Sequence, residues 1–236
     1  SLPPAMVMRL NRARPLTPWT SPVLYRMATR LARRAGVATP QLYLIPSAEP
    51  NALSTGGPDN GAVAVTAGLL RLLHPRELEA VLAHEVAHIR NDDVRLLDLV
   101  SAASSAITLL LKVALWLSVL FLLVFGGSFL RVLQLAVLAF TAPLIVGWLQ
   151  SALSRTRELA AAATAVRISG RARELASALL KLNRRQNLLL GMFSSRARVP
   201  PMLRSHPATE DRVRRLLELA PPVPQQRIYR PFARPY

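Results

Sequence analysis

Two histidines four residues apart carry the clearest chemical signal in the sequence. His84 and His88 bracket Glu85 within an otherwise apolar stretch, residues 80–89. Helical side chains at i and i+4 share one face, so both imidazoles can reach one metal ion at Zn–N distances of about 2.0–2.1 Å. Glu85 lies beside them and can take a proton from an attacking water. The pattern predicts a zinc site with two histidine ligands and Glu85 as general base, and a helix with two surface histidines is the plainer alternative.

A catalytic zinc ion needs a third protein ligand, and the sequence offers few candidates. Of the four histidines, His74 lies at the start of the same predicted helix and points away, while His206 is distant. Glu158 lies in an Ala-rich helical stretch beyond the apolar segment described next. Its position alone leaves two interpretations open, a solvated helix face or a metal ligand.

A long apolar segment separates the histidines from Glu158. Between residues 99 and 150 the only charged residues are Lys112 and Arg131. Ile107–Phe125 and Val132–Leu149 are each close to the roughly 20 residues that cross a bilayer. The segment predicts a two-helix transmembrane hairpin, and a buried hairpin of two core helices is the alternative.

Arginines flank this hairpin on the side of the histidines and Glu158, and they predict its orientation. Arg90, Arg95, Arg155 and Arg157 lie at its two ends, whereas the far turn carries only Arg131. Positive residues stay on the cytoplasmic side of a membrane. We therefore expect both flanks of the hairpin, and the polar domain that they carry, to lie in the cytoplasm.

The amino-acid composition excludes several other classes of protein. The chain of 236 residues has no cysteine and is 51% hydrophobic, which excludes disulfide-stapled domains, thiol catalysis and a fully disordered chain. The net charge of +17 invites a nucleic-acid interpretation. Because the arginines are scattered rather than arranged in a known motif, we expect membrane lipids and no nucleic acid as partners.

The remaining patterns organise the chain around these features. Helices are expected at 21–35, from Pro75 to beyond Asp93, and at 151–169, 171–182 and 207–219, with strands at 41–45 and 62–66 and a loop at 47–60. The expected regions are a basic arm (1–20), a first catalytic part (21–98), the hairpin (99–150), a second catalytic part (151–220) and a Pro/Arg-rich tail (221–236).

Several motifs in order resemble the HtpX-like integral-membrane zinc metalloproteases, a gluzincin-type family related to the CAAX prenyl proteases. The resemblance spans roughly residues 14–219. Besides the histidine motif, the matching segments are Pro50–Gly56, Ala62–Thr66 with Gly68–Leu70, Asn91 and Asp93, Ser154–Glu158, and Ser205–Pro207 with Thr209 and Glu210.

The resemblance implies a fold that is mainly α with a small β-sheet, a zincin-like metalloprotease domain interrupted by the transmembrane hairpin. It implies His84, His88 and Glu158 as ligands of one Zn²⁺ per chain and Glu85 as the catalytic base. It also implies an edge strand at 62–66 that holds an extended substrate by β-addition. The substrate-binding residues implied with it are Ala62, Val63, Ala64, Asn51 and His206, although a loop-turn role for Asn51 and a helix-start role for His206 are equally open.

The implied function is a membrane-embedded zinc endopeptidase that hydrolyses membrane proteins or peptides at the cytoplasmic face, in protein quality control. The implied location is a bacterial-type inner (plasma) membrane, which the chain crosses more than once. Two departures motivate an alternative. The family usually has an acidic residue four positions after the ligand glutamate, where this chain has Ala162, and two earlier spans that are missing here. Loss of a carboxylate that orients a ligand typically costs about 10–100-fold in metal affinity or activity. The alternative is a catalytically weak or inactive homologue that serves as a structural subunit of a larger membrane assembly.

Overall fold

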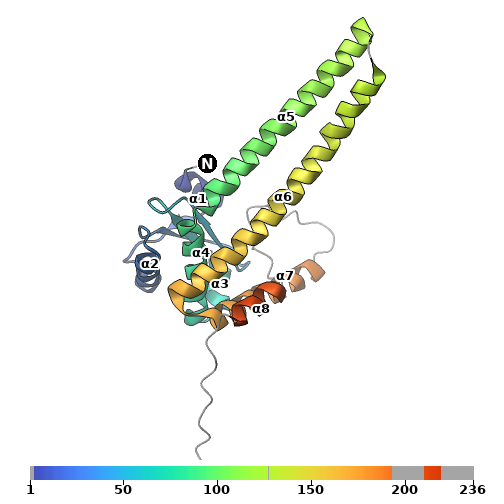
Figure 1. The fold of residues 1–236 in the computed structure, drawn as a ribbon. Coiled ribbons are helices and arrows are strands. Elements are labelled where there is room, and N and C mark those ends of the chain that lie inside the picture. Colours follow the sequence, from blue (N-terminus) through green and yellow to red (C-terminus); the bar gives the residue numbers. More distant parts are fainter. Residues whose placement is uncertain (1–2, 127, 193–209, 219–236) are drawn as a thin grey trace, which may run out of the picture.

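A bundle of helices surrounds one small sheet, and a long helical hairpin projects from it (Figure 1). The computed structural model describes residues 3–126, 128–192 and 210–218. The helices are α1 (Pro4–Leu10), α2 (Pro22–Ala35), α3 (Ala67–Leu72), α4 (Pro75–Arg90), α5 (Asp93–Phe125), α6 (Phe129–Ser169), α7 (Ala172–Met192) and α8 (Glu210–Glu218). The strands are β1 (Arg14–Pro15), β2 (Gln41–Ile45), β3 (Ala52–Thr55) and β4 (Ala62–Thr66). The mainly helical fold with a small sheet is confirmed.

Helix α4 lies at the centre of the domain, in contact with α2, α6 and α7. Pro75 at its first position is compatible with helix geometry, and the Glu77 carboxylate accepts a hydrogen bond from the His74 N–H at 2.9 Å. The helix is buried continuously from Glu77 to Ile89. It ends at Arg90, so the expectation of a helix running beyond Asp93 is wrong.

The sheet has the order β1-β2-β4-β3, with β2 parallel to β4 and β3 antiparallel to β4. Strand β4, which carries Ala62, Val63 and Ala64, is therefore paired on both sides and fully buried. The expectation of an edge strand at 62–66 is wrong. The strand at this edge of the sheet is β3, and β1 lies at the opposite edge. Strand β3 lies inside the segment expected to be a loop, and its four residues are too short a pattern to stand out among the flanking Pro, Gly and Asn.

Residues 3–20 do not form an extended arm. They contain α1 and β1, and β1 pairs with β2. Met8 of α1 is completely buried against Ile45, Ala62 and Ala64. This second small cluster explains the helix, since packing of one apolar side chain under the sheet outweighs the weak local pattern.

The hairpin helices α5 and α6 are long and apolar enough to cross a membrane. Only 0% and 6% of their most apolar windows are buried, and Trp116 and Phe140 are 73% and 75% exposed. A buried soluble hairpin is therefore excluded, because its side chains would lie in a core. Helix α6 runs without a break from the hairpin to Ser169, so the expected helix end at residue 169 is confirmed, and Gly170 caps it in a left-handed conformation.

At the carboxyl end, α7 is longer than expected and continues to Met192. Helix α8 lies within the last predicted helix and packs on α7. His206 and the tail at 221–236 lie outside the described residues.

Candidate metal centre

His84, His88 and Glu158 come together although a hairpin separates them in the chain. The two histidines lie one turn apart on α4, and Glu158 comes from α6. Both helices bury alanines in the shared core, which allows their backbones to approach closely. One candidate ligand atom from each of the three residues lies within 4.8 Å of the others. For Glu158 this placement favours the ligand interpretation over the solvated face.

The distances between these atoms fit one tetrahedral ion. The two Nε2 atoms of His84 and His88 are 3.1 Å apart. Of the two carboxylate oxygens of Glu158, Oε2 lies 3.4 Å from His84 Nε2 and Oε1 lies 3.5 Å from His88 Nε2. An ion with bonds of about 2.0–2.2 Å separates tetrahedral ligand atoms by roughly 3.4 Å. Two imidazoles and one carboxylate are also the donor set of a catalytic zinc site with an open fourth position. The residues present therefore fit a zinc ion.

Glu85 is held by a strand that the sequence alone did not predict. The Ser54 hydroxyl donates a hydrogen bond to Glu85 Oε2 at 2.7 Å. Ser54 lies on the edge strand β3, which packs beside α4. This bond orients the carboxylate proposed as a base and places the sheet edge next to it.

A second carboxylate lies behind His88. Asp93 Oδ2 is 2.7 Å from His88 Nδ1, and Asp93 is buried. The Arg157 guanidinium pairs with the same carboxylate and donates to the Asn91 carbonyl at 3.1 Å. The site therefore includes a partly buried ion pair between the start of α5 and α6.

Arg212 brings a cation into the centre from α8. Its guanidinium is 2.9 Å from His84 Nε2 and 3.0 Å from Glu158 Oε2, and its side chain is only 3% exposed. A guanidinium stays protonated in proteins, so a permanent positive charge adjoins the Glu158 carboxylate. This contact limits the orientation of the Glu158 carboxylate.

The two histidines have opposite pKa shifts. Burial lowers the pKa of His84 well below its ordinary value, and the neighbouring positive charge of His88 lowers it further. Burial also acts to lower the pKa of His88, but the hydrogen bond to Asp93 and the charge of Glu85 outweigh it, and that pKa is raised. The Glu85 and Asp93 carboxylates thus stabilise positive charge on His88.

The other predicted site residues are placed differently. Asn51 is buried, and its backbone N–H donates to the Thr66 hydroxyl at 2.8 Å, which joins the start of β3 to the end of β4. Its role in a cleft remains a prediction. Ala62, Val63 and Ala64 lie inside the sheet rather than at its edge.

Sequence reasoning did not find Ser54 or Arg212. Ser54 lies in the matching segment Pro50–Gly56, but nothing in the sequence distinguished it there, because β3 itself was not recognised. For Arg212 the sequence contains a weak signal. This arginine lies four residues before Leu216, and both residues are buried on one face of α8. A charge on the apolar face of an amphipathic helix points to a buried partner.

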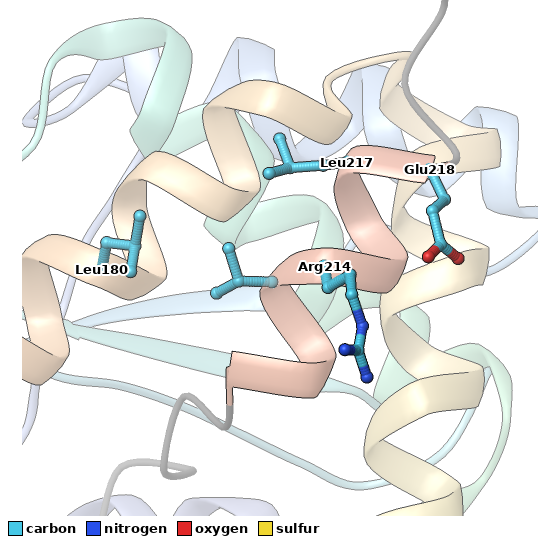
Figure 2. Close-up of a pocket in the computed structure, with 5 residues that line it drawn as sticks. Leu180, Arg214, Leu217 and Glu218 are labelled. Carbon is cyan, nitrogen blue, oxygen red and sulfur yellow. The ribbon is translucent and has the colours of Figure 1, made fainter.

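A pocket of about 500 Å³ between α7 and α8 lies apart from the metal cluster. Figure 2 shows Leu180 of α7 facing Leu217 of α8, with Arg214 and Glu218 at its rim. These α8 residues lie on the opposite face from buried Arg212, so this pocket is not part of the candidate centre.

Comparisons with known proteins agree with this geometry. The chain is 38% identical over 238 residues to a "Protease HtpX homolog" of Pelotomaculum thermopropionicum, covering 91% of this chain and 82% of that protein. It is 40% identical over 229 residues to one of Acaryochloris marina, covering 88% and 75%. It is 35% identical over 239 residues to one of Ralstonia nicotianae, covering 91% and 80%. The family model described as Peptidase family M48 matches residues 18–220. With the His-His-Glu cluster and two helices suited to a membrane, the chain belongs to peptidase family M48.

Proposed function

We propose that the chain is a zinc-dependent endopeptidase that hydrolyses membrane proteins at the cytoplasmic face of a bacterial-type inner membrane, in protein quality control. The observation that carries the proposal is the convergence of His84, His88 and Glu158 beside Glu85. These three residues would hold the zinc ion. Zinc in such a site lowers the pKa of water to about 7 and polarises a substrate carbonyl.

Glu85 is the proposed general base. Its carboxylate accepts a hydrogen bond from Ser54 at 2.7 Å, which leaves the other oxygen to take a proton from the attacking water. The same carboxyl group then returns the proton to the amine nitrogen as the peptide bond breaks. Arg212 adds a fixed positive charge beside Glu158, which favours the negative charge that develops on the carbonyl oxygen.

Strand β3 is the proposed substrate edge. It is the last strand in the sheet and packs beside α4, and its Ser54 bonds the proposed base. An extended peptide that pairs with an open sheet edge presents its amide bonds in a regular array. A substrate on β3 would therefore place a peptide bond near Glu85.

The hairpin supports a membrane substrate. Glu158 and the exposed apolar surface belong to one continuous helix, α6. From Leu149 to Glu158 this helix covers roughly 14 Å. The candidate centre therefore lies close to the segment that suits a bilayer, where loops of membrane proteins are within reach.

The test is Glu85→Gln in the full chain, co-reconstituted with a membrane protein of known topology that the wild type cleaves. Loss of a general base typically costs about 10²–10⁴-fold in rate. We expect that loss with zinc content unchanged, since Gln keeps the shape of Glu. Cleavage at the wild-type rate, or wild-type protein without stoichiometric zinc, would contradict the proposal.

The matched control is Glu174→Gln, which removes a carboxylate from a surface pair with Arg171 at 3.5 Å. We expect wild-type zinc content and wild-type cleavage. The cut sites should map to cytoplasmic segments of the substrate, and cuts only on the opposite side would overturn the proposed orientation.

A further inference from the structure

The turn between α4 and α5 brings Asp93 back to His88. In a continuous helix, side chains five residues apart diverge by about 140° and do not meet. Here α4 ends at Arg90, and Asp92 adopts a left-handed conformation with φ 53° before α5 starts at Asp93. Aspartate tolerates this region better than most residues. The reversal is what places Asp93 Oδ2 at 2.7 Å from His88 Nδ1.

This contact assigns the two ring nitrogens of His88 to different tasks. Nδ1 faces the Asp93 carboxylate, while Nε2 faces His84 Nε2 at 3.1 Å and Glu158 Oε1 at 3.5 Å. A histidine whose Nδ1–H is donated to a carboxylate keeps the Nε2 lone pair for a metal and cannot rotate freely. Asp93 therefore fixes both the tautomer and the direction of this side chain.

Arg157 holds Asp93 from the other side of the hairpin. The Asp93 side chain is only 3% exposed, and a buried carboxylate requires a charged or hydrogen-bonding partner. Arg157 supplies one, and it immediately precedes Glu158 on α6. The pair joins the start of α5 to α6 at the level of the metal cluster.

We infer that Asp93 is the positioning carboxylate of the metal centre and that its ion pair with Arg157 sets the spacing between His88 and Glu158. Position 162 cannot supply such a group, since the side chain of Ala162 is a methyl group that packs in the apolar core. Asp93 reaches His88 from a different element. The inference rests on the proposed zinc function, because it assigns a task toward that ion.

The experiment measures zinc affinity of the full chain in detergent, by competition with a chelator. We expect Asp93→Asn to weaken zinc binding by about 10–100-fold. Arg157→Met, at a side chain that is 26% exposed, should weaken it by about 10-fold while the chain stays folded. Because Arg157 acts through Asp93, adding Arg157→Met to Asp93→Asn should cost less than its effect alone.

Asp92→Asn is the matched control. Asp92 is adjacent in sequence, forms an exposed pair with Arg95 at 3.3 Å, and is left-handed, a conformation that Asn also accepts. We expect wild-type zinc affinity for this variant.

Cobalt(II) substitution provides a readout that general stability does not move, because its visible absorption reports the geometry of the ligands. We expect Asp93→Asn to shift this spectrum and Asp93→Glu to restore part of the zinc affinity. Wild-type zinc affinity and a wild-type cobalt spectrum in Asp93→Asn would overturn the inference while leaving the proposed protease intact. Weakened zinc binding in Asp93→Asn, with no cleavage by wild-type protein, would support the inference and contradict the proposed function.

Discussion

Helix α4 and the hairpin helices α5 and α6 differ in how burial and charge are combined. Helix α4 is buried from Glu77 to Ile89 and yet carries five ionisable side chains in that stretch. The apolar part of α5, from Ile107 to Phe125, is exposed, although it carries just one charged residue, Lys112. Ordinary soluble domains show neither arrangement as a rule.

Partners explain the charges on α4. Glu77 accepts hydrogen bonds from Ser177 and Lys181, both at 2.7 Å. Glu79 lies between Arg30 and Arg171, each at 2.9 Å. Buried charge is tolerated where it is paired and hydrogen-bonded, so each of these carboxylates ties α4 to another helix.

The surrounding medium explains the hairpin. Exposed side chains such as Trp116, Phe121, Phe125 and Phe140 gain nothing from water. They are stable on the outside of a protein when the outside is lipid. The exposure of side chains on α5 and α6 therefore has to be compared with a lipid surrounding, and that of the polar domain with water.

The largest effect is expected from a charge in the middle of the hairpin. Leu117→Arg places a guanidinium near the centre of the apolar part of α5, and the swap should disfavour membrane insertion by about 3–4 kcal/mol. The measurement is the inserted fraction after extraction of membranes at alkaline pH. The control is Leu99→Arg, also exposed but near the polar domain, which should insert like the wild type. Equal insertion of Leu117→Arg and Leu99→Arg would contradict the assignment of this part of α5 to the membrane.

A smaller effect is expected from Glu77→Gln in α4. Burial raises the pKa of Glu77, but hydrogen bonds from Lys181, Ser177 and the His74 N–H outweigh it and hold that pKa below its ordinary value. A carboxyl with a lowered folded pKa stabilises the fold above its unfolded pKa and loses this effect as pH falls through the folded value. We expect the variant to lose about 1.5 kcal/mol in the free energy of unfolding at neutral pH.

The measurement is denaturant unfolding in detergent at neutral pH and in acid, where the difference between wild type and Glu77→Gln should shrink. Glu174→Gln, in a surface pair, should change the free energy of unfolding by less than about 0.5 kcal/mol at either pH. A difference that grows in acid would contradict the assigned role of Glu77.

The smallest effect is expected when one methylene group is removed from a side chain of α4 or of α5. Ile89→Val, in the fully buried part of α4, should lower the free energy of unfolding by about 1 kcal/mol. Ile107→Val, half exposed on α5, should leave it nearly unchanged in detergent. Denaturant midpoints of the two variants give the answer, and equal shifts would show that the two helices are packed alike.

Much of this arrangement could be predicted where the signal is local. The helix at 22–35, the strands at 41–45 and 62–66 and the hairpin all follow from periodicity or length of apolar runs. The same rules failed for β3 and for the break at Asp92, because a four-residue strand and one left-handed residue leave little pattern. They also failed to place β4, since a strand's position in the sheet depends on its partners.

The spacing of His84 and His88 alone determined that they share a helix face, and hydropathy alone determined that a membrane-sized hairpin follows. Only the tertiary structure decided that Glu158 reaches the histidines, that Ser54 holds Glu85, and that Asp93 and Arg212 enter the site. The physical reason is range: a helical period is set by neighbours along the chain, whereas these contacts join residues up to 128 positions apart. Such contacts depend on how whole helices and strands pack against each other.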